Sequence, residues 1–226
     1  MKTSYALMCI ILAALIIGGC GRPRESQIES AIERELPRVI GPAESYSVDV
    51  QGIRDSSGAD RVIANGRRVQ PAGSPVLDRV NITLTDVVYN ASRQELERVG
   101  QADGTVRVLS GDIASFLENN RNLEDVEVQL QSPNQVIVRA RSSIAQLGNT
   151  EVETTGTLRV DGPRINYDIS RVRAGGVTLP SPAPRLLSDE INPIVDLSSM
   201  PIVMQVTSIR VESNAVIASV TGKYPP

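Results

Sequence analysis

The feature that most constrains the fold of this chain is the alternation of apolar and polar residues through most of the sequence after Tyr46. In residues 80–85 and 165–169, every second side chain is apolar, which gives an extended strand one apolar and one polar face. Strands of this kind form antiparallel sheets that place one face on a core and the other in water. Short turn sequences at residues 132–134 and 161–163 separate neighbouring strands. The pattern therefore predicts antiparallel ribbons rather than a parallel sheet buried on both faces.

The same pattern locates the strands along the chain. One segment, residues 92–104, is mixed in character, and a short strand is expected directly after it. The other strands are expected at residues 46–50, 61–70, 80–85, 126–130, 136–141, 152–160, 165–169, 202–209 and 211–221.

Three amphipathic helices alternate with these ribbons. Pro37 is expected to end or bend the first, Ser110 or Asp112 can cap the second, and Pro193 interrupts the third. Their apolar faces carry Ile28, Ile32 and Leu36 on the first helix, Ile113, Phe116 and Leu117 on the second, and Leu187, Ile191 and Ile194 on the third. Since no linker is long enough to divide the chain, we expect one α+β domain over residues 26–226, with a curved antiparallel sheet over the helices.

The N-terminal residues are typical of a bacterial lipoprotein signal. Lys2 precedes an uncharged run of 14 residues, which is shorter than the roughly 20 apolar residues that cross a bilayer. The run ends in Ile-Gly-Gly-Cys at residues 17–20, which resembles the lipobox that precedes lipid attachment. We therefore expect a signal peptide over residues 1–19, acylation of Cys20, and a tether over residues 20–25. The alternatives are an ordinary signal peptide that contains a cysteine, or a short anchor.

Cysteine usage supports acylation. Cys9 leaves with the signal, so the mature chain keeps Cys20 alone and can form no internal disulfide. Each buried CH₂ of an acyl chain adds about 0.8 kcal/mol of membrane affinity, so several chains give a stable anchor in the bacterial cell envelope. The residue after the cysteine is Gly21, and not an acidic residue of the kind that retains lipoproteins in the inner membrane. In a cell with two membranes, this favours the periplasmic face of the outer membrane.

The composition excludes several classes of function. Histidine is absent, which removes the commonest general base and the commonest imidazole metal ligand. Lys223 is the sole lysine of the mature chain and no Gly-x-Ser-x-Gly motif is present, which disfavours a serine hydrolase. Without Lys2, the chain has 22 basic and 26 acidic residues, and aromatic residues are scarce. We therefore expect no nucleic-acid partner. We also expect no enzyme activity, cofactor or metal.

Clusters of acidic residues need separate consideration, as a catalytic carboxylate pair and as a calcium site. A catalytic carboxylate pair remains an alternative, either at Glu124 and Asp125 or at Asp189 and Glu190. Both pairs are also explained as solvated residues at strand ends and on helix faces. Residues 55–60 resemble a calcium loop but lack its following glutamate, so a surface turn is the preferred interpretation.

Several segments, in their order and spacing, resemble the LmeA-like family of bacterial phospholipid-binding proteins. They are residues 27–36, 77–87, 108–117 and 187–197, followed by Met200 and Pro201 and the two final strands. The resemblance implies a fold like that of the tubular lipid-binding (TULIP-like) domains, in which a long curved antiparallel sheet wraps a helix and leaves an apolar trough for acyl chains. The resemblance identifies no catalytic residues in this chain.

Our first hypothesis is a lipid-anchored protein that holds or passes phospholipid or glycolipid acyl chains in the cell envelope. The apolar helix residues named above are the candidate trough lining, although each of them can be ordinary core. A core built from Val, Ile, Leu and Ala with Phe116 as its one phenylalanine can leave unfilled space. The alternative is a scaffold lipoprotein with a closed core that docks a protein partner. An enzyme that acts on envelope lipid or glycan is the third hypothesis, which the missing histidine disfavours.

Overall fold

The computed structural model describes residues 25–54, 58–90, 93, 95–142, 150–200 and 202–224. The expected signal peptide, Cys20 and the tether up to residue 24 lie outside these residues, as does part of the acidic turn at residues 55–57. The helices are α1 (Glu25–Val39), α2 (Ser110–Asn120) and α3 (Ala183–Ile191). The strands are β1 (Ser45–Arg54), β2 (Gly58–Val69), β3 (Leu77–Asn90), β4 (Glu95–Leu109), β5 (Leu123–Gln131), β6 (Gln135–Ser142), β7 (Thr150–Asp161), β8 (Arg164–Ala174), β9 (Val177–Thr178), β10 (Val195–Asp196), β11 (Val203–Val211) and β12 (Ala215–Tyr224).

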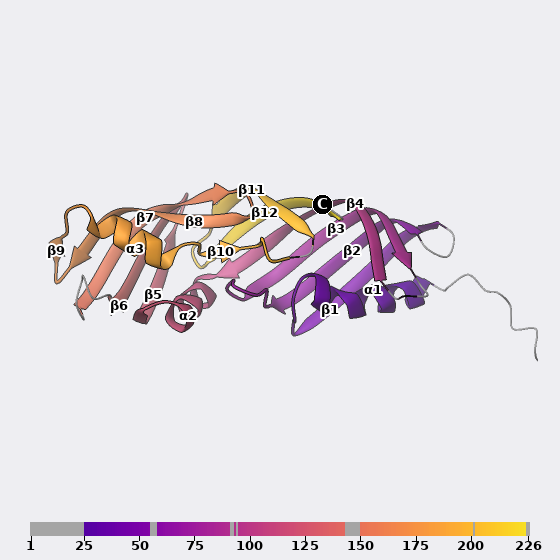
Figure 1. Ribbon diagram of the computed structural model, residues 1–226, viewed down its shortest axis with the longest axis horizontal. Helices are drawn as coiled ribbons and strands as arrows, with labels where there is room; N and C mark the ends of the chain where they lie inside the picture. Colours follow the sequence, from indigo (N-terminus) through magenta and orange to yellow (C-terminus); the bar gives the residue numbers. More distant parts are fainter. Residues whose placement is uncertain are drawn as a thin grey trace, which may run out of the picture.

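The strands form two sheets that lie side by side along an elongated molecule (Figure 1). The first has the order β1-β2-β3-β4-β12-β11, and the second has the order β10-β8-β7-β6-β5 with β9 paired to β8. All pairings between the described strands are antiparallel. The expected α+β fold with an extended antiparallel surface is therefore confirmed, with that surface divided into two sheets.

Both ends of the described chain build the first sheet. β12 pairs with β4 from Ala215 opposite Leu109 onward, so the C-terminal hairpin completes a sheet that the N-terminal strands begin. The outer strand of this hairpin, β11, meets the second sheet, because the Val206 N–H donates to the Gly162 carbonyl in the β7–β8 turn at 2.9 Å. The two sheets are thus joined by main-chain hydrogen bonding at β11.

The expectation of a mixed segment at residues 92–104 is wrong, because β4 extends over 15 residues. It runs between β3 and β12, which hydrogen-bond to its two edges. Gly104 breaks the apolar alternation in the sequence, yet it is required here, since a Cβ at this position would lie 2.3 Å from the Asn81 carbonyl oxygen. Glycine inside a strand commonly marks such a close approach between backbones.

The helix ends also differ from expectation. α1 continues through Pro37 to Val39, and its last turn is held by burial of Val39 and of Ile40, whose N–H donates to the Leu36 carbonyl at 2.8 Å. No side chain caps the start of α2. The Ser110 N–H instead donates to the Asn214 carbonyl at 2.9 Å. The β11–β12 turn thus satisfies a main-chain N–H at the start of α2 in place of a side-chain cap.

α3 ends at Ile191 rather than continuing to Pro193. Asn192 is extended, with φ −83° and ψ 151°, because a residue that precedes proline is disfavoured in the helical region. Its side-chain amide then accepts from the Tyr167 N–H at 2.6 Å and donates to the Tyr167 carbonyl at 3.0 Å. Ile194 therefore lies beyond the helix, in the segment that Asn192 fastens to β8.

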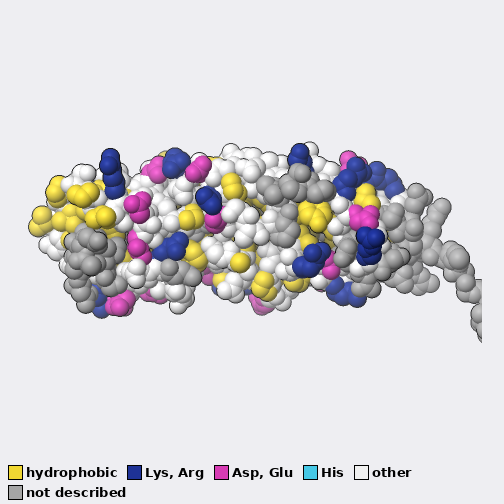
Figure 2. All heavy atoms as spheres, in the orientation of Figure 1, with side chains coloured by type: hydrophobic (Ala, Val, Ile, Leu, Met, Phe, Trp, Pro, Cys, Tyr) yellow, Lys and Arg dark blue, Asp and Glu magenta, His cyan; other side chains and the backbone are white. Residues whose placement is uncertain are grey.

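The surface carries charges of both signs along the face shown in Figure 2. Apolar side chains gather at the end of the molecule formed by β9 and α3, where Val177 is 66% exposed. Among the described residues, no helix combines the length and apolar character that a membrane span requires.

Candidate functional site

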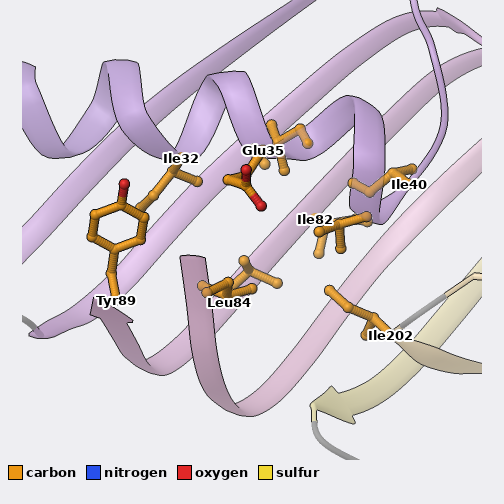
Figure 3. Close-up of a pocket in the computed structure, with 11 residues that line it drawn as sticks. Ile32, Glu35, Ile40, Ile82, Leu84, Tyr89 and Ile202 are labelled. Carbon is orange, nitrogen blue, oxygen red and sulfur yellow. The ribbon is translucent and has the colours of Figure 1, made fainter. Parts of the chain in front are cut away.

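The buried face of α1 and the inner face of the first sheet enclose an apolar pocket (Figure 3). α1 and the residue after it supply Ile32, Glu35, Leu36, Val39 and Ile40. The sheet supplies Ala64 from β2, Ile82, Leu84 and Tyr89 from β3, and Leu96 from β4, while Ile202 before β11 closes one end.

Local sequence patterns place these side chains. Ile32 and Leu36 are four residues apart on α1 and therefore share a face, on which both are at most 4% exposed. On β3, Ile82 and Leu84 alternate with the outward-facing Asn81 and point to the same side of the sheet. Full burial of such side chains stabilises the fold by roughly 1.5–3 kcal/mol each, so the lining is also core.

The pocket is closed in this state of the protein. The space that a water-sized sphere can occupy between α1 and the sheet is about 10 Å³. Pockets that hold small organic ligands usually measure roughly 300–1,000 Å³. α1 therefore fills the apolar face of the first sheet, and an organic ligand of that size does not fit between the two without a movement of the helix.

Mainly apolar contacts hold the described part of α1 on the sheet. The Val50 N–H of β1 donates to Glu29 Oε1 of α1 at a long 3.3 Å, whereas most side chains that line the pocket are apolar. The joint after α1 is firmly fixed, because the Gln70 N–H donates to the Pro42 carbonyl at 2.8 Å and the Tyr46 hydroxyl to the Gly41 carbonyl at 2.6 Å. Gly41 itself has φ +134°, a conformation open to glycine. These residues form a joint at Gly41 that fixes the C-terminal end of α1 to the first sheet.

Two polar side chains line the pocket. Glu35 lies between Ile32 and Ile40 (Figure 3), and its Oε2 accepts from Arg38 Nη2 at 2.7 Å and Nε at 2.9 Å. Tyr89 is 4% exposed, and its hydroxyl has no hydrogen-bond partner among the described residues. The pKa of Tyr89 is raised, first by burial and further by the Glu35 charge, with Arg34 acting in the opposite direction. The group is therefore a neutral hydroxyl that can donate.

A second, more polar groove of about 670 Å³ lies between the β2–β3 loop and α2. Arg68 and Asp112 form an ion pair on its wall, and Phe116 lines it. Ser74 pins the loop to β10, because its Oγ donates to the Asp196 carbonyl at 2.7 Å and accepts from the Asp196 N–H at 2.8 Å. This groove has a rigid wall but no continuous apolar lining.

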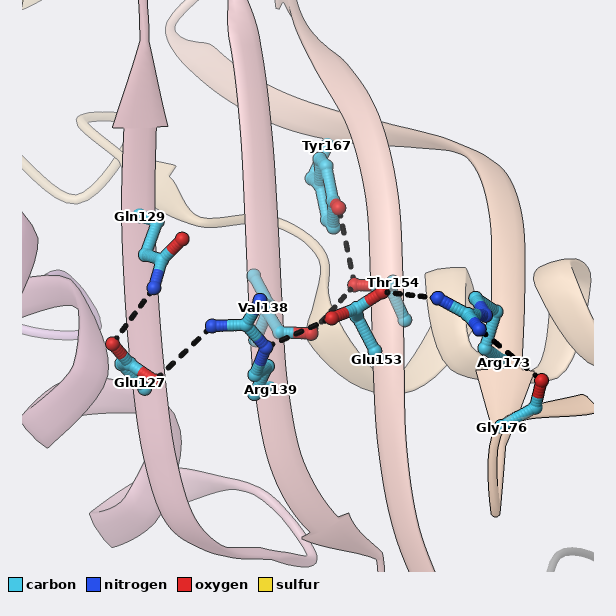
Figure 4. A network of polar contacts seen from close by, with 9 residues as sticks. All are labelled: Glu127, Gln129, Val138, Arg139, Glu153, Thr154, Tyr167, Arg173 and Gly176. Atoms are coloured by element: carbon cyan, nitrogen blue, oxygen red, sulfur yellow. Dashed lines mark hydrogen bonds and ion pairs between the residues drawn. The ribbon is translucent and has the colours of Figure 1, made fainter.

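A ladder of charged side chains crosses the outer face of the second sheet (Figure 4). Arg139 Nε donates to Glu153 Oε2 at 2.8 Å, and Arg139 also pairs with Glu127 at 3.5 Å. The hydrogen bond from Arg139 lowers the pKa of Glu153 despite its desolvation. On the inner face, Thr154 Oγ1 lies 3.0 Å from the Tyr167 hydroxyl, which also donates to the Val136 carbonyl at 3.1 Å. These groups satisfy one another, which indicates a structural role.

Three of the four acidic residues weighed in the sequence also have polar partners. Arg141 pairs with Asp125 at 2.9 Å and with Glu124 at 4.0 Å. Glu190 Oε1 accepts from the N–H and the Nδ2 of Asn122 at 3.0 and 2.9 Å. Within the part of the chain that the structure describes, no three His, Cys, Asp or Glu side chains gather as metal ligands would.

The predicted trough residues do not share one pocket. Ile32 and Leu36 line the space beneath α1, and Phe116 lines the polar groove. The others are buried in the core: Ile28 on α1, Ile113 and Leu117 on α2, Leu187 and Ile191 on α3, and Ile194 after α3. α1 and α3 cover different sheets at opposite ends of the molecule, so their apolar faces cannot meet (Figure 1).

Sequence reasoning missed the sheet side of the pocket. The alternation of residues 80–85 identifies Ile82 and Leu84 as inward-facing, but it does not say which helix covers them. Tyr89 and Leu96 flank the β3–β4 turn, and the pairing of Tyr89 with Leu96 across that turn brings them together. Ile202 is distant in sequence, and only the return of the C-terminal hairpin to the first sheet explains its place.

Comparison with known proteins adds one finding. The model of the LmeA-like phospholipid-binding family matches residues 25–221, which include all three helices and both sheets. Searches of curated proteins and of solved structures find no match to this chain.

Proposed function

Because the chain belongs to the LmeA-like phospholipid-binding family, we propose that it binds the acyl chains of a phospholipid or glycolipid between α1 and the first sheet. The binding is non-enzymatic and serves the maintenance or transfer of lipid in the bacterial cell envelope. Acylated Cys20 holds the protein at the membrane from which the lipid comes.

The observation that carries this proposal is the apolar interface under α1. Ile32, Leu36 and the facing side chains of β3 form a continuous apolar surface on both sides of it. An acyl chain that lay between α1 and the sheet would keep both of these faces out of water, so the exchange of helix–sheet contacts for lipid contacts costs little apolar burial. We therefore propose that α1 lifts about the Gly41 joint and that the lipid lies beneath it.

The test is mass spectrometry of lipid that co-purifies with the full chain in mild detergent. Organic extraction releases bound lipid and leaves the covalent anchor on the protein. A matched pair of variants locates the site: Ala64 lines the pocket, whereas Ala102 is equally buried on β4 outside it. Ala64→Leu should reduce bound phospholipid per folded protein several-fold. Ala102→Leu should leave it unchanged, although overpacking costs either variant about 1–3 kcal/mol.

One observation favours the scaffold alternative, namely the small free volume of about 10 Å³ beneath α1. A scaffold with a closed core would use its outer surface, where the groove between the β2–β3 loop and α2 is the larger hollow. Extracts free of phospholipid from a stable, folded wild-type chain would reject lipid binding and support this alternative.

A further inference from the structure

Tyr89 differs from Tyr46 and Tyr167, whose hydroxyls are hydrogen-bonded. The Tyr46 hydroxyl donates to the Gly41 carbonyl at 2.6 Å, and the Tyr167 hydroxyl contacts both Thr154 and the Val136 carbonyl. Tyr89 is 4% exposed, yet its hydroxyl has no such partner among the described residues. A buried polar group without a partner is unfavourable, and in a native fold it calls for an explanation.

The position of the Tyr89 hydroxyl suggests an explanation for its missing partner. Figure 3 shows the Tyr89 ring at one end of the pocket, with its hydroxyl directed towards α1 beside Ile32, while Ile40 and Ile202 lie at the other end. Tyr89 thus places the one hydroxyl of the lining at that end of the pocket. A lone water at Tyr89 would have Glu35 as the one other polar side chain of the lining, which makes two partners and is the low end of the two to four that buried waters usually have.

We propose that the Tyr89 hydroxyl donates a hydrogen bond to an acyl ester carbonyl of the bound lipid. This inference rests on the proposed function and adds the orientation of the ligand. The glycerol end of the lipid lies at Tyr89, and its chains run along the sheet past Leu84 towards Ile202.

An ester fits this place better than a free fatty acid. A fatty-acid carboxylate would bury a full charge against an apolar lining in which Glu35 is already paired with Arg38, and this costs far more than burying a neutral ester. An ester carbonyl is uncharged and accepts one hydrogen bond, which matches the one donor that Tyr89 offers. The ligand class is therefore a diacyl glycerolipid rather than a fatty acid.

Native mass spectrometry of the full chain, released from detergent micelles, measures the binding. The probes are an ester-linked phosphatidylglycerol, its ether-linked analogue with the same head group and chains, and palmitate. The wild-type protein should bind the ester lipid about fivefold more tightly than the ether lipid, as expected for one neutral hydrogen bond, and palmitate least. Tyr89→Phe should remove the preference for the ester, so that the ester and the ether lipid bind equally well.

Tyr46→Phe is the matched control, since it removes a hydroxyl that is already bonded outside the pocket. It should retain the ester preference and lower the melting temperature. Tyr89→Phe should melt at or above the wild-type temperature, because it removes an unpartnered group. This opposite shift separates a role in binding from a role in folding.

Equal binding of ester and ether lipid by the wild type, or an ester preference that survives Tyr89→Phe, would overturn this inference and leave the proposed function standing. Palmitate bound more tightly than either phospholipid would overturn the ligand class. Failure of the wild type to bind any of the three would overturn the proposed function itself.

Discussion

Arg68 and Asp112 form a two-pronged ion pair, with Nη1 to Oδ2 at 2.6 Å and Nη2 to Oδ1 at 2.8 Å. Arg68 stands near the end of β2 in a left-handed conformation, with φ 52°, and Asp112 lies in the first turn of α2. Since α2 packs on β5, the pair connects the first sheet to the element that leads into the second. The carboxylate also lies at the favourable, positive end of the α2 dipole.

Asp112→Ala should lower the free energy of unfolding by about 1–2 kcal/mol, because bidentate charge-assisted bonds are stronger than ordinary ones but Arg68 is partly exposed. Urea denaturation measures the loss. The control is Glu212→Ala, which breaks the exposed pair with Arg210 and should change stability by less than about 0.5 kcal/mol. Equal losses in the two variants would contradict the connecting role.

Gly41→Ala should destabilise the protein by about 1–3 kcal/mol, the usual strain at a backbone conformation restricted to glycine. The added Cβ would also lie 2.9 Å from the Gln70 carbonyl oxygen. Gly73→Ala is the comparison, because Gly73 also has a positive φ of 75° but no atom within 4 Å of the new Cβ. The loss of stability in Gly73→Ala should be smaller than in Gly41→Ala. A larger loss at Gly73, measured by the denaturation midpoint, would refute the steric argument.

The pKa of Asp196 is lowered, because hydrogen bonds from Ser198 and the Arg164 charge outweigh the desolvation that would raise it. A carboxyl whose folded pKa lies below its unfolded value of about 3.9 stabilises the protein above that pH and loses this contribution as the pH falls through the folded pKa.

Asp196→Asn should therefore be less stable than the wild type at pH 7, and the difference should shrink below about pH 4. Asp189→Asn, on the exposed face of α3, is the control and should show little difference from the wild type across the range. Urea unfolding at pH 7, 5, 4 and 3 provides the comparison. A difference for Asp196→Asn that stays constant down to pH 3 would disprove the assignment.

Cys20→Ser should abolish incorporation of labelled palmitate and leave an uncleaved precursor or release soluble protein. The basis is the Ile-Gly-Gly-Cys sequence at residues 17–20. Processing of the wild type should be sensitive to globomycin. Wild-type protein that carries no palmitate would show that the N-terminus is an ordinary signal or anchor.

Local sequence determined which faces of the elements are buried. The four-residue spacing of Ile28, Ile32 and Leu36 gave the buried side of α1, and the alternation at Ile82 and Leu84 gave that of β3. Both follow from the fixed geometry of a helix and of a strand, in which spacing along the chain sets direction in space. The family resemblance, which rests on the order of such segments, also predicted the α+β class.

Tertiary structure decided how those faces meet. The division into two sheets, the place of β12 beside β4 and the course of α1 through Pro37 depend on partners that are distant in sequence. Tyr89 is the sharpest case, since a tyrosine near a turn is unremarkable until α1 covers it and removes its hydroxyl from water. Burial and hydrogen bonding are properties of the assembled surroundings, and periodicity specifies the direction of a side chain but not what it will face.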